Sequence, residues 1–326
     1  MIYTTIKKLL FFLAGLILSY ESLFAQSRCI QNAEQRSGTI SLNGKWHYII
    51  DPYENGYYDY RYMPFDVNEN APALSTGFFA DAKANNRWER IEYNFDASPT
   101  LYVPGDWNSQ EEKLFWYEGT VWYRRKFDHP AAQPGDRVFV HFGAVNYKAE
   151  VYLNGKKLGV HIGGFTPFQF EVTGLIKSEG NSLVVKVDNK RCRACVPTLN
   201  TDWFNYGGIT RDVHLIVTPA TFIEDYLVQL DNKNREIIQG YVQLNGQALA
   251  QKVTVEIPEL KINVSGICDA NGRFQFNTRH KKINYWSPDN PKLYQVSIKT
   301  DKETVHDNIG LRTVSVSGTE ILLNGK

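Results

Sequence analysis

Tyr147-Lys-Ala-Glu-Val-Tyr-Leu153-Asn154-Gly155 is the stretch of sequence that decides the fold, because it predicts a β-hairpin. Alternate residues of a strand point to the same side, so one face would carry Tyr147, Ala149, Val151 and Leu153. Asn-Gly between two such runs is typical of a type I′ turn, which needs positive φ at both central residues. Residues Lys157–His161 are then expected to return as the partner strand.

The same two-residue period continues on both sides of this hairpin. Strands are predicted at Arg137–Phe142, Ser182–Val187 and Val213–Val217. Turn signals recur roughly every 8–12 residues, the spacing expected of a β-sandwich. Residues Tyr57–Asn94 are less regular and are predicted to be long loops that decorate the sandwich.

A second, smaller β-unit is predicted from about Phe222 onwards. Seven short strands in about a hundred residues are typical of an immunoglobulin-like sandwich, although the Cys-Trp-Cys framework of antibody domains is missing. The predicted strands are Tyr226–Leu230, Ile237–Leu244, Lys252–Ile257, Lys261–Ile267, Arg273–Phe276, Leu293–Lys299 and Glu303–Ile309.

Length and charge narrow the class of protein. The chain has 326 residues, enough for two domains of ordinary size. Its 36 basic and 35 acidic residues give a net charge of +1, without a long run of one sign. A nucleic-acid or anionic-membrane partner would call for a basic excess or stripe, so we expect neither.

The N-terminus predicts a secretory signal peptide at residues 1–25. Lys7 and Lys8 precede the apolar run Leu9–Leu18, and Ala25 offers a small residue for cleavage. The run is about half as long as the roughly 20 residues of a membrane-spanning helix, so a retained anchor is the less favoured alternative. We expect the mature protein to be exported, periplasmic or extracellular, and free of the membrane.

Four cysteines in an exported chain of this length do not make a disulfide scaffold. Cys192 and Cys195 form a lone C-x-x-C pair. A zinc site would need further ligands nearby, so a local disulfide or two free thiols is favoured over zinc. Cys29 and Cys268 follow no pattern.

The segment Asp202–Val213 is the candidate binding site. It combines a carboxylate (Asp202), three aromatic residues, the amide of Asn205 and a Gly-Gly bend, just before a predicted strand. Sugars offer apolar C–H faces for stacking and hydroxyls for hydrogen bonds, so this composition favours carbohydrate binding. The alternative is that the aromatics close the edge of the sandwich while Asp202 caps a turn.

Catalytic motifs are absent from the sequence. It contains no metalloprotease H-E-x-x-H, no nucleophile elbow, no phosphate loop and no dinucleotide fingerprint. Retaining glycosidases need two carboxylates about 5–5.5 Å apart, and no acidic pair stands out. We therefore predict no catalytic residue, no metal ligand and no cofactor.

Several motifs together resemble the N-terminal part of glycoside hydrolase family 2, which includes β-galactosidases, β-glucuronidases and β-mannosidases. The matching residues keep the family's order over nearly the whole mature chain. They are Leu42–Trp46, Val103–Trp107, Tyr117–Arg125, Phe142–Tyr147, Val151–Gly155, Gly163–Phe168, Asp202–Val213, Trp286–Pro288, Pro291–Tyr294 and Ile309–Arg312.

The resemblance implies an all-β chain whose first domain is a jelly-roll, galactose-binding-like sandwich at 26–220. An immunoglobulin-like sandwich at 221–318 would follow, and then the opening of a (β/α)₈ barrel at 319–326. In the family both catalytic glutamates lie on the barrel, which needs about 250 residues. We therefore expect this chain to lack the barrel and, alone, to be inactive.

The resemblance also implies a role for Asp202, which in the family reaches the edge of the barrel's active site and contacts substrate hydroxyls or, in some members, a cation. Trp203, Asn205 and Tyr206 would be its neighbours at the substrate, with Trp203 or Tyr206 stacking on a sugar.

Two functions remain open from the sequence. One is the N-terminal portion of an exported retaining β-glycosidase of β-glucuronidase or β-galactosidase type, with a carbohydrate substrate, a barrel as partner domain and homo-oligomers allowed. The alternative is a free-standing carbohydrate-binding accessory protein without hydrolase activity. A purely structural or adhesive module fits the motifs less well.

Overall fold

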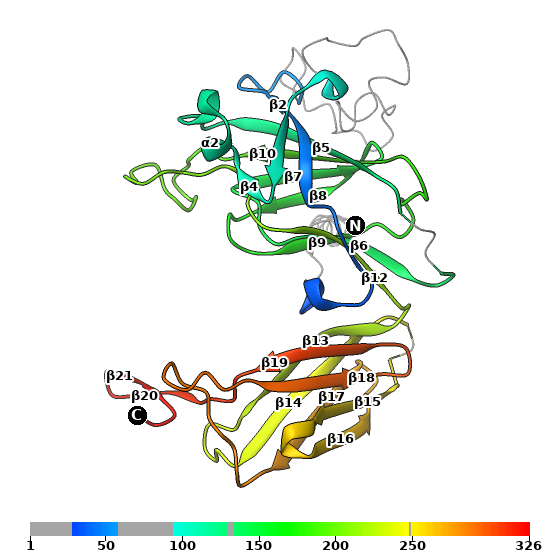
Figure 1. Cartoon of the computed structure of the whole chain (residues 1–326), viewed down its shortest axis with the longest axis vertical. Helices are drawn as coiled ribbons and strands as arrows, with labels where there is room; N and C mark the ends of the chain where they lie inside the picture. Colours follow the sequence, from blue (N-terminus) through cyan, green and yellow to red (C-terminus); the bar gives the residue numbers. More distant parts are fainter. Residues whose placement is uncertain (1–27, 58–93, 130–132, 248) are drawn as a thin grey trace, which may run out of the picture.

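The computed structural model describes residues 28–57, 94–129, 133–247 and 249–326. They form two β-sandwiches in succession, the first above the second in Figure 1. The strands within them pair antiparallel. The all-β prediction is therefore confirmed. The predicted signal peptide and residues 58–93 of the predicted loops lie outside the described ranges.

The first sandwich has the two unequal sheets of a jelly roll. The larger sheet has six strands in the order β3 (Thr100–Val103), β2 (Gly44–Ile50), β5 (Thr120–Phe127), β10 (Asn181–Asp188), β7 (Lys148–Leu153) and β8 (Lys156–Ile162). The smaller sheet has four, in the order β1 (Thr39–Ser41), β12 (Val213–Thr218), β6 (Arg137–Phe142) and β9 (Phe168–Glu171).

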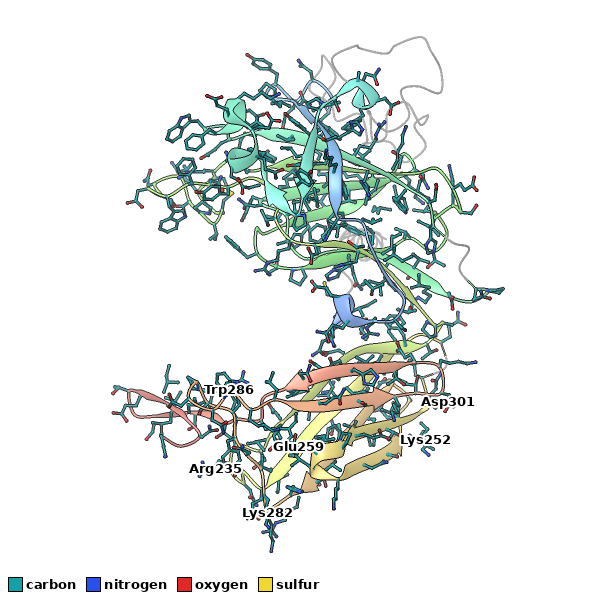
Figure 2. The ribbon with its side chains drawn as sticks, viewed as in Figure 1. Arg235, Lys252, Glu259, Lys282, Trp286 and Asp301 are labelled. Atoms are coloured by element: carbon teal, nitrogen blue, oxygen red, sulfur yellow. A yellow bond between two sulfur atoms is a disulfide. The ribbon has the colours of Figure 1, made fainter. Side chains whose placement is uncertain are left out.

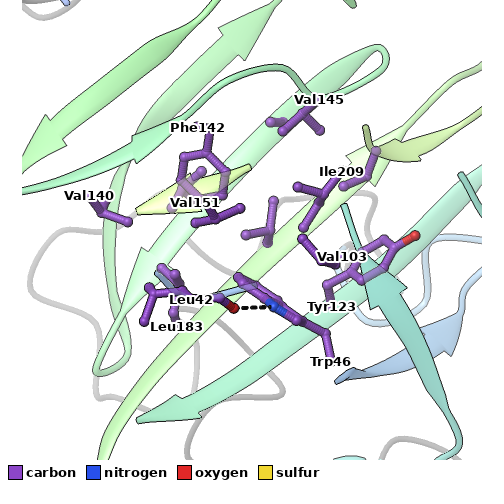
Figure 3. Close-up of a cluster of buried hydrophobic side chains, with 14 of the residues drawn as sticks. Leu42, Trp46, Val103, Tyr123, Val140, Phe142, Val145, Val151, Leu183 and Ile209 are labelled. Carbon is purple, nitrogen blue, oxygen red and sulfur yellow. Dashed lines mark hydrogen bonds between the residues drawn. The ribbon is translucent and has the colours of Figure 1, made fainter. Parts of the chain in front are cut away.

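Alternate residues from both sheets fill the space between them. Ala149, Val151 and Leu153 of β7 all enter this core, as their spacing predicts. Trp46 is fully buried there, and its indole nitrogen donates to the Leu42 carbonyl at 2.9 Å (Figure 3). A buried indole N–H needs such a partner. Tyr147 differs from the prediction: it precedes β7 and is half-buried, and the residue before it, Asn146, forms an isolated bridge with Gly208.

The predicted hairpin is confirmed, with φ of 52° at Asn154 and 81° at Gly155. The Asn154 side chain ties the turn to the rest of the sandwich: its amide nitrogen donates to the Leu175 carbonyl at 2.8 Å, and its oxygen accepts from the Ser182 N–H at 2.9 Å. Asparagine therefore suits this position both by its backbone and by its side chain.

The second sandwich is built of the seven strands that the sequence predicts. One sheet contains β13 (Phe222–Leu230), β14 (Ile237–Asn245) and β17 (Arg273–Arg279). The other contains β16 (Ile262–Ile267), β15 (Lys252–Ile257), β18 (Tyr294–Lys299) and β19 (Thr304–Ile309). A separate apolar cluster lies between these two sheets, so each sandwich has its own core.

The two sandwiches meet through a small apolar cluster and a buried ion pair. Phe139, Ile216 and Phe222 pack together under the N-terminal segment. Beside them the Arg36 guanidinium donates to the Ile223 carbonyl at 2.5 Å and pairs with Glu303 at 3.3 Å. Burial raises the pKa of Glu303, although Arg36 opposes the shift. The apolar cluster and the ion pair together join the second sandwich to the first.

A short hairpin of β20 (Val314–Ser317) and β21 (Glu320–Leu323) ends the chain. It projects from the second sandwich near Trp286, whose carbonyl accepts from the Asn324 amide at 2.9 Å (Figure 2). Asn324 also accepts from the Thr313 N–H at 3.0 Å. The predicted domain boundary between residues 318 and 319 falls in the turn of this hairpin and remains a prediction.

No helix in the described part of the chain is both long and apolar enough to cross a membrane.

A buried carboxylate lies on the outer face of the six-stranded sheet. Glu150 is almost fully buried, and its oxygens contact the ammonium groups of Lys148 at 3.0 Å, Lys157 at 2.8 Å and Lys186 at 3.5 Å. Burial alone would raise the pKa of Glu150, but the three lysines outweigh it and lower the pKa to about 2. Lys186 also contacts Glu54 at 3.4 Å, so the charges form a network.

Replacing this carboxylate should change how stability depends on pH. The folded-state pKa of Glu150 is lower than the roughly 4.3 of an unfolded chain. Its contribution is therefore present above that pH and is lost as the pH falls towards 2, by about 3 kcal/mol in all. Glu150→Gln should be less stable at pH 7, and urea unfolding at pH 7, 5 and 3.5 should show the gap to wild type shrinking.

The matched control is Glu179→Gln, since Glu179 is exposed and the structure shows no ion pair for it among the described residues. This variant should follow the wild type at each pH. A gap for Glu150→Gln that stays constant with pH would contradict the assignment of the low pKa to this group.

Candidate functional site

The candidate site lies at one end of the first sandwich, where two loops leave the six-stranded sheet. One loop, residues 189–207, connects β10 to β11 (Gly208–Ile209) and carries the predicted binding residues. The other, residues 111–119, contains the turn η6 (Glu112–Leu114) and leads into β5. Together they enclose a pocket of about 190 Å³ lined by Asn108, Phe115, Trp116, Glu118, Arg191, Thr201, Asp202, Trp203, Phe204 and Asn205.

Arg191 presents Asp202 to this pocket by holding the backbone on both sides of it. The guanidinium donates to the carbonyl of Thr201 at 2.5 Å and to that of Trp203 at 3.0 Å. Its Nε donates to Glu118 of the other loop at 2.9 Å. Asp202 itself is exposed, and its carboxylate accepts no hydrogen bond from any described residue. The turn-capping alternative for Asp202 therefore finds no support in these contacts.

Cys192 and Cys195 form a disulfide directly after Arg191, with a Cα–Cα distance of 5.0 Å. Of the alternatives that the sequence left for this pair, the structure has the local disulfide. The zinc alternative lacks ligands, since the described ranges contain no group of three or more His, Cys, Asp or Glu side chains that could hold a metal. The disulfide closes a small ring near the start of the loop 189–207, which carries Asp202 further along.

The aromatic residues of the site stack outside the core. Trp203 is 65% exposed at the pocket rim, and Tyr206 is 50% exposed but does not line the pocket. The ring of Phe204 lies between those of Tyr206 and Trp116, with centroids at 5.3 and 5.1 Å and near-parallel planes. These aromatics face solvent, so they do not close the edge of the sandwich. Their contact with a sugar remains a prediction.

Asn205 lies deeper than its predicted neighbours at the substrate. It is buried, its amide nitrogen donates to the Asn189 carbonyl, and its oxygen accepts from the Asn146 amide at 3.0 Å. Asn189 donates in return to the Asn205 carbonyl at 2.8 Å. The Asn205 side chain thus anchors the loop to the residues beneath it, and Asn205 also lines the pocket.

A second buried amide, Asn108 in the short helix α2 (Trp107–Gln110), joins the two loops. Its oxygen accepts from the Gly207 N–H at 2.9 Å, and its nitrogen donates to the Leu114 carbonyl at 2.9 Å. Gly207 itself lies against Trp107, because a Cβ there would come within 2.1 Å of the indole ring. Only glycine allows the loop to lie this close to the helix.

The sequence did not point to Phe115, Trp116 or Arg191. Phe115 and Trp116 stand just before Tyr117, where the family-like motif begins, and nothing in their spacing places them beside residues 203–206. The available signal was a run of three aromatics, Phe115 to Tyr117, directly before Glu118-Gly119 and outside any alternating pattern. Arg191 directly precedes the C-x-x-C pair, and nothing in that motif predicts its contacts with Glu118 and the backbone around Asp202.

Comparisons with known proteins agree with this arrangement. Residues 39–219 match the family described as "Glycosyl hydrolases family 2, sugar binding domain", and residues 221–312 match "Glycosyl hydrolases family 2". The chain belongs to glycosyl hydrolase family 2. The fold and the resemblance predicted from the motifs are thereby confirmed.

Relatives of the chain are β-galactosidases and β-glucuronidases. A β-galactosidase of Thermoanaerobacter pseudethanolicus is 31% identical over 214 residues, 61% of this chain and 29% of its own. A β-glucuronidase of Bacteroides fragilis is 30% identical over 279 residues, 76% of this chain and 40% of its own. The solved β-glucuronidase of Bifidobacterium dentium, in complex with coumarin-3-O-glucuronide, superposes with a TM-score of 0.69 at 25% identity and covers 90% of this chain and 51% of that one. The chain thus spans about half or less of these proteins.

Removing the guanidinium of Arg191 should loosen the loop without unfolding the sandwich. Arg191→Ala removes both carbonyl contacts and the pair with Glu118, and it leaves the core untouched. Hydrogen exchange of residues 199–207 should accelerate about tenfold or more while the thermal midpoint changes little. Arg193→Ala is the control, since Arg193 is exposed and forms no hydrogen bond or ion pair with any described residue. Equal exchange in both variants would contradict the role of Arg191.

Truncating Asn205 should be costly for the whole first domain. Asn205→Ala leaves the buried Asn189 carbonyl without its side-chain donor and removes one of the two acceptors of the Asn146 amide, which keeps its bond to the Tyr206 carbonyl. Leaving a buried group unsatisfied costs about 1–3 kcal/mol. Chemical unfolding should show a lower midpoint. The exposed Asn200→Ala serves as control and should stay within about 0.5 kcal/mol of wild type. A neutral Asn205→Ala would show that water replaces these bonds.

Proposed function

We propose that this chain is the substrate-positioning N-terminal portion of an exported retaining β-glycosidase of β-glucuronidase or β-galactosidase type. Membership of the family and the names of its relatives support the glycosidase class. The solved relative that carries coumarin-3-O-glucuronide supports a β-linked sugar as the substrate.

The observation that carries the proposal is the free carboxylate of Asp202 beside aromatic faces. Arg191 holds the backbone so that this carboxylate lines the pocket without a hydrogen-bond donor among the described residues. A carboxylate accepts hydrogen bonds from two neighbouring hydroxyls, and hydrogen bonds to charged groups are worth about 1.5–3 kcal/mol. Trp203 at the rim would cover an apolar face of the same ring.

We assign the two carboxylates of retaining hydrolysis to a partner domain and not to the described residues. The other acidic residue of the pocket, Glu118, is held by Nε of Arg191 at 2.9 and 3.2 Å through its two oxygens. It therefore serves the loop as an anchor. In this proposal the catalytic glutamates come from a barrel domain, and the chain alone does not cleave glycosides.

Export is part of the proposal. A basic start, a short apolar run and Ala25 support a signal peptide. The disulfide between Cys192 and Cys195 supports an oxidising compartment, where such bonds persist. N-terminal sequencing of the secreted protein should begin at Gln26, and recovery of the intact N-terminus from the cytoplasm would contradict export.

The role of Asp202 can be tested in the protein that is expressed from the uninterrupted reading frame containing this sequence. This protein should hydrolyse p-nitrophenyl β-D-glucuronide or β-D-galactoside with retention. Asp202→Asn should lower kcat/KM about 10- to 100-fold, since a charge-assisted hydrogen bond is weakened. Asp289→Asn, an exposed acid of the second sandwich, is the control and should leave the rate unchanged.

The alternative, a carbohydrate-binding accessory protein, rests on the observation that both sandwiches have complete cores and the pocket forms within this chain. A reading frame that encodes no barrel, together with saturable binding of methyl β-D-glucuronide or methyl β-D-galactoside by the chain, would favour it. Hydrolysis that depends on Asp202 would decide for the glycosidase.

A further inference from the structure

A continuous aromatic surface extends from the pocket across both loops. We call Phe115, Trp116, Phe204 and Tyr206 the aromatic shelf. Trp116 is 79% exposed, Tyr206 50% and Phe115 44%. Trp116, Phe204 and Tyr206 stack in sequence, and Phe115 meets Trp116 and Phe204 edge-on at 4.9 and 5.2 Å. Soluble domains rarely leave such a contiguous apolar patch in water without a use for it.

The turn that carries Phe115 and Trp116 is held rigidly at its base. Leu114 is buried in the core, and the Asn108 amide donates to the carbonyls of Leu114 at 2.9 Å and of Tyr117 at 3.1 Å. The indole nitrogen of Trp107 also donates to the Tyr117 carbonyl at 3.2 Å. Because the anchors stand on both sides of the aromatic pair, the shelf is formed before any ligand binds.

The shelf forms one wall of the pocket, which Phe115, Trp116 and Phe204 help to line, and continues beyond it at Tyr206. The pocket measures about 190 Å³, less than the 300–1,000 Å³ typical of sites for drug-sized ligands, so it has room for one ring. It carries the Asp202 carboxylate and the Arg191–Glu118 pair. The shelf has no charged side chain of its own, and its three stacked rings extend beyond the pocket through Phe204 to Tyr206.

We propose that the aromatic shelf binds a second sugar ring of a β-linked oligosaccharide, with Trp116 as the stacking residue that determines this specificity. The inference rests on the proposed function, because it takes the first ring to be the one held at Asp202. In a β-D-glucose ring all hydroxyls are equatorial, so both faces are lined by axial C–H groups. Such a face fits the flat, uncharged and preformed surface of Trp116 and needs no hydrogen bond there.

The test compares one-ring and two-ring ligands on the 326-residue chain. The probes are methyl β-D-galactoside against lactose and methyl β-D-glucuronide against β-D-glucuronosyl-(1→4)-D-glucose, titrated by ¹H–¹⁵N NMR with tryptophan indole signals as readout. The wild type should bind the disaccharide of at least one pair about three- to tenfold more tightly than its methyl glycoside, since stacking on an aromatic face adds about 0.5–1.5 kcal/mol.

Trp116→Ala should abolish the preference for the disaccharide. Because Trp116 also lines the pocket, the affinity for the methyl glycoside should fall by a smaller factor. Trp116→Phe, which keeps a flat ring, should retain most of the preference. Tyr53→Ala is the matched control, because Tyr53 is 84% exposed on a different loop and should have no effect. Trp116 is so exposed that its truncation should leave the thermal midpoint in place, which is checked in parallel.

The outcomes separate this inference from the function on which it rests. Equal affinity of the wild type for both members of each pair, or no binding of either, overturns the shelf as a sugar site. Loss of binding to all ligands in Asp202→Asn, with the preference absent in wild type, supports the role of Asp202 and rejects that of Trp116. A preference that depends on Trp116 but is unaffected by Asp202→Asn supports the shelf and rejects the role of Asp202. Sedimentation that shows a dimer in wild type and a monomer in Trp116→Ala would assign the shelf to a second copy and overturn the inference.

Discussion

Buried amide side chains hold the loops of the site, and the rest of the binding geometry depends on them. A loop of nineteen residues, 189–207, leaves the sheet without strand partners for most of its backbone groups. Buried peptide groups need hydrogen bonds, and here Asn108, Asn146, Asn189 and Asn205 supply them. An amide both donates and accepts, so four of them can satisfy N–H and C=O groups without burying a charge. These amides hydrogen-bond buried backbone groups of a loop that forms no strand.

This constraint also explains where the charged groups of the site stand. Arg191 and Glu118 are placed at the rim, where solvent reduces the cost of their charges, and the guanidinium reaches inwards only to carbonyl oxygens. Within the described part of the chain, Asp202 is the pocket carboxylate that accepts no hydrogen bond. The buried amides thus hold the loops in place, and the charged side chains stand at the rim. This arrangement is expected of a site that binds a polar ligand from water.

The strands were predictable because each depends on local pattern. The hairpin at Asn154-Gly155 and the seven strands of the second sandwich follow from two-residue alternation and turn residues alone. The exposed positions of Asp202, Trp203 and Tyr206 were also foreseeable, since they stand in a polar loop. The burial of Asn205 was not, because its partner Asn146 is 59 positions away and an asparagine looks the same in sequence whether it faces solvent or a carbonyl. No local sequence signal predicts the contact of Trp116 with Phe204 or that of Arg36 with Glu303, because only the tertiary fold brings these residues together.

The small size of the Cys192–Cys195 loop has a consequence for how this domain responds to its surroundings. A crosslink stabilises mainly by restricting the unfolded chain, and the restriction is weakest for short loops. With a separation of three residues, this bond adds little to the global free energy of folding. What it stiffens is the peptide that follows Arg191. Under reducing conditions the thermal midpoint should therefore stay almost unchanged, while the loop 189–207 becomes less firmly held. Thermal stability would then be a poor measure of whether the site is intact.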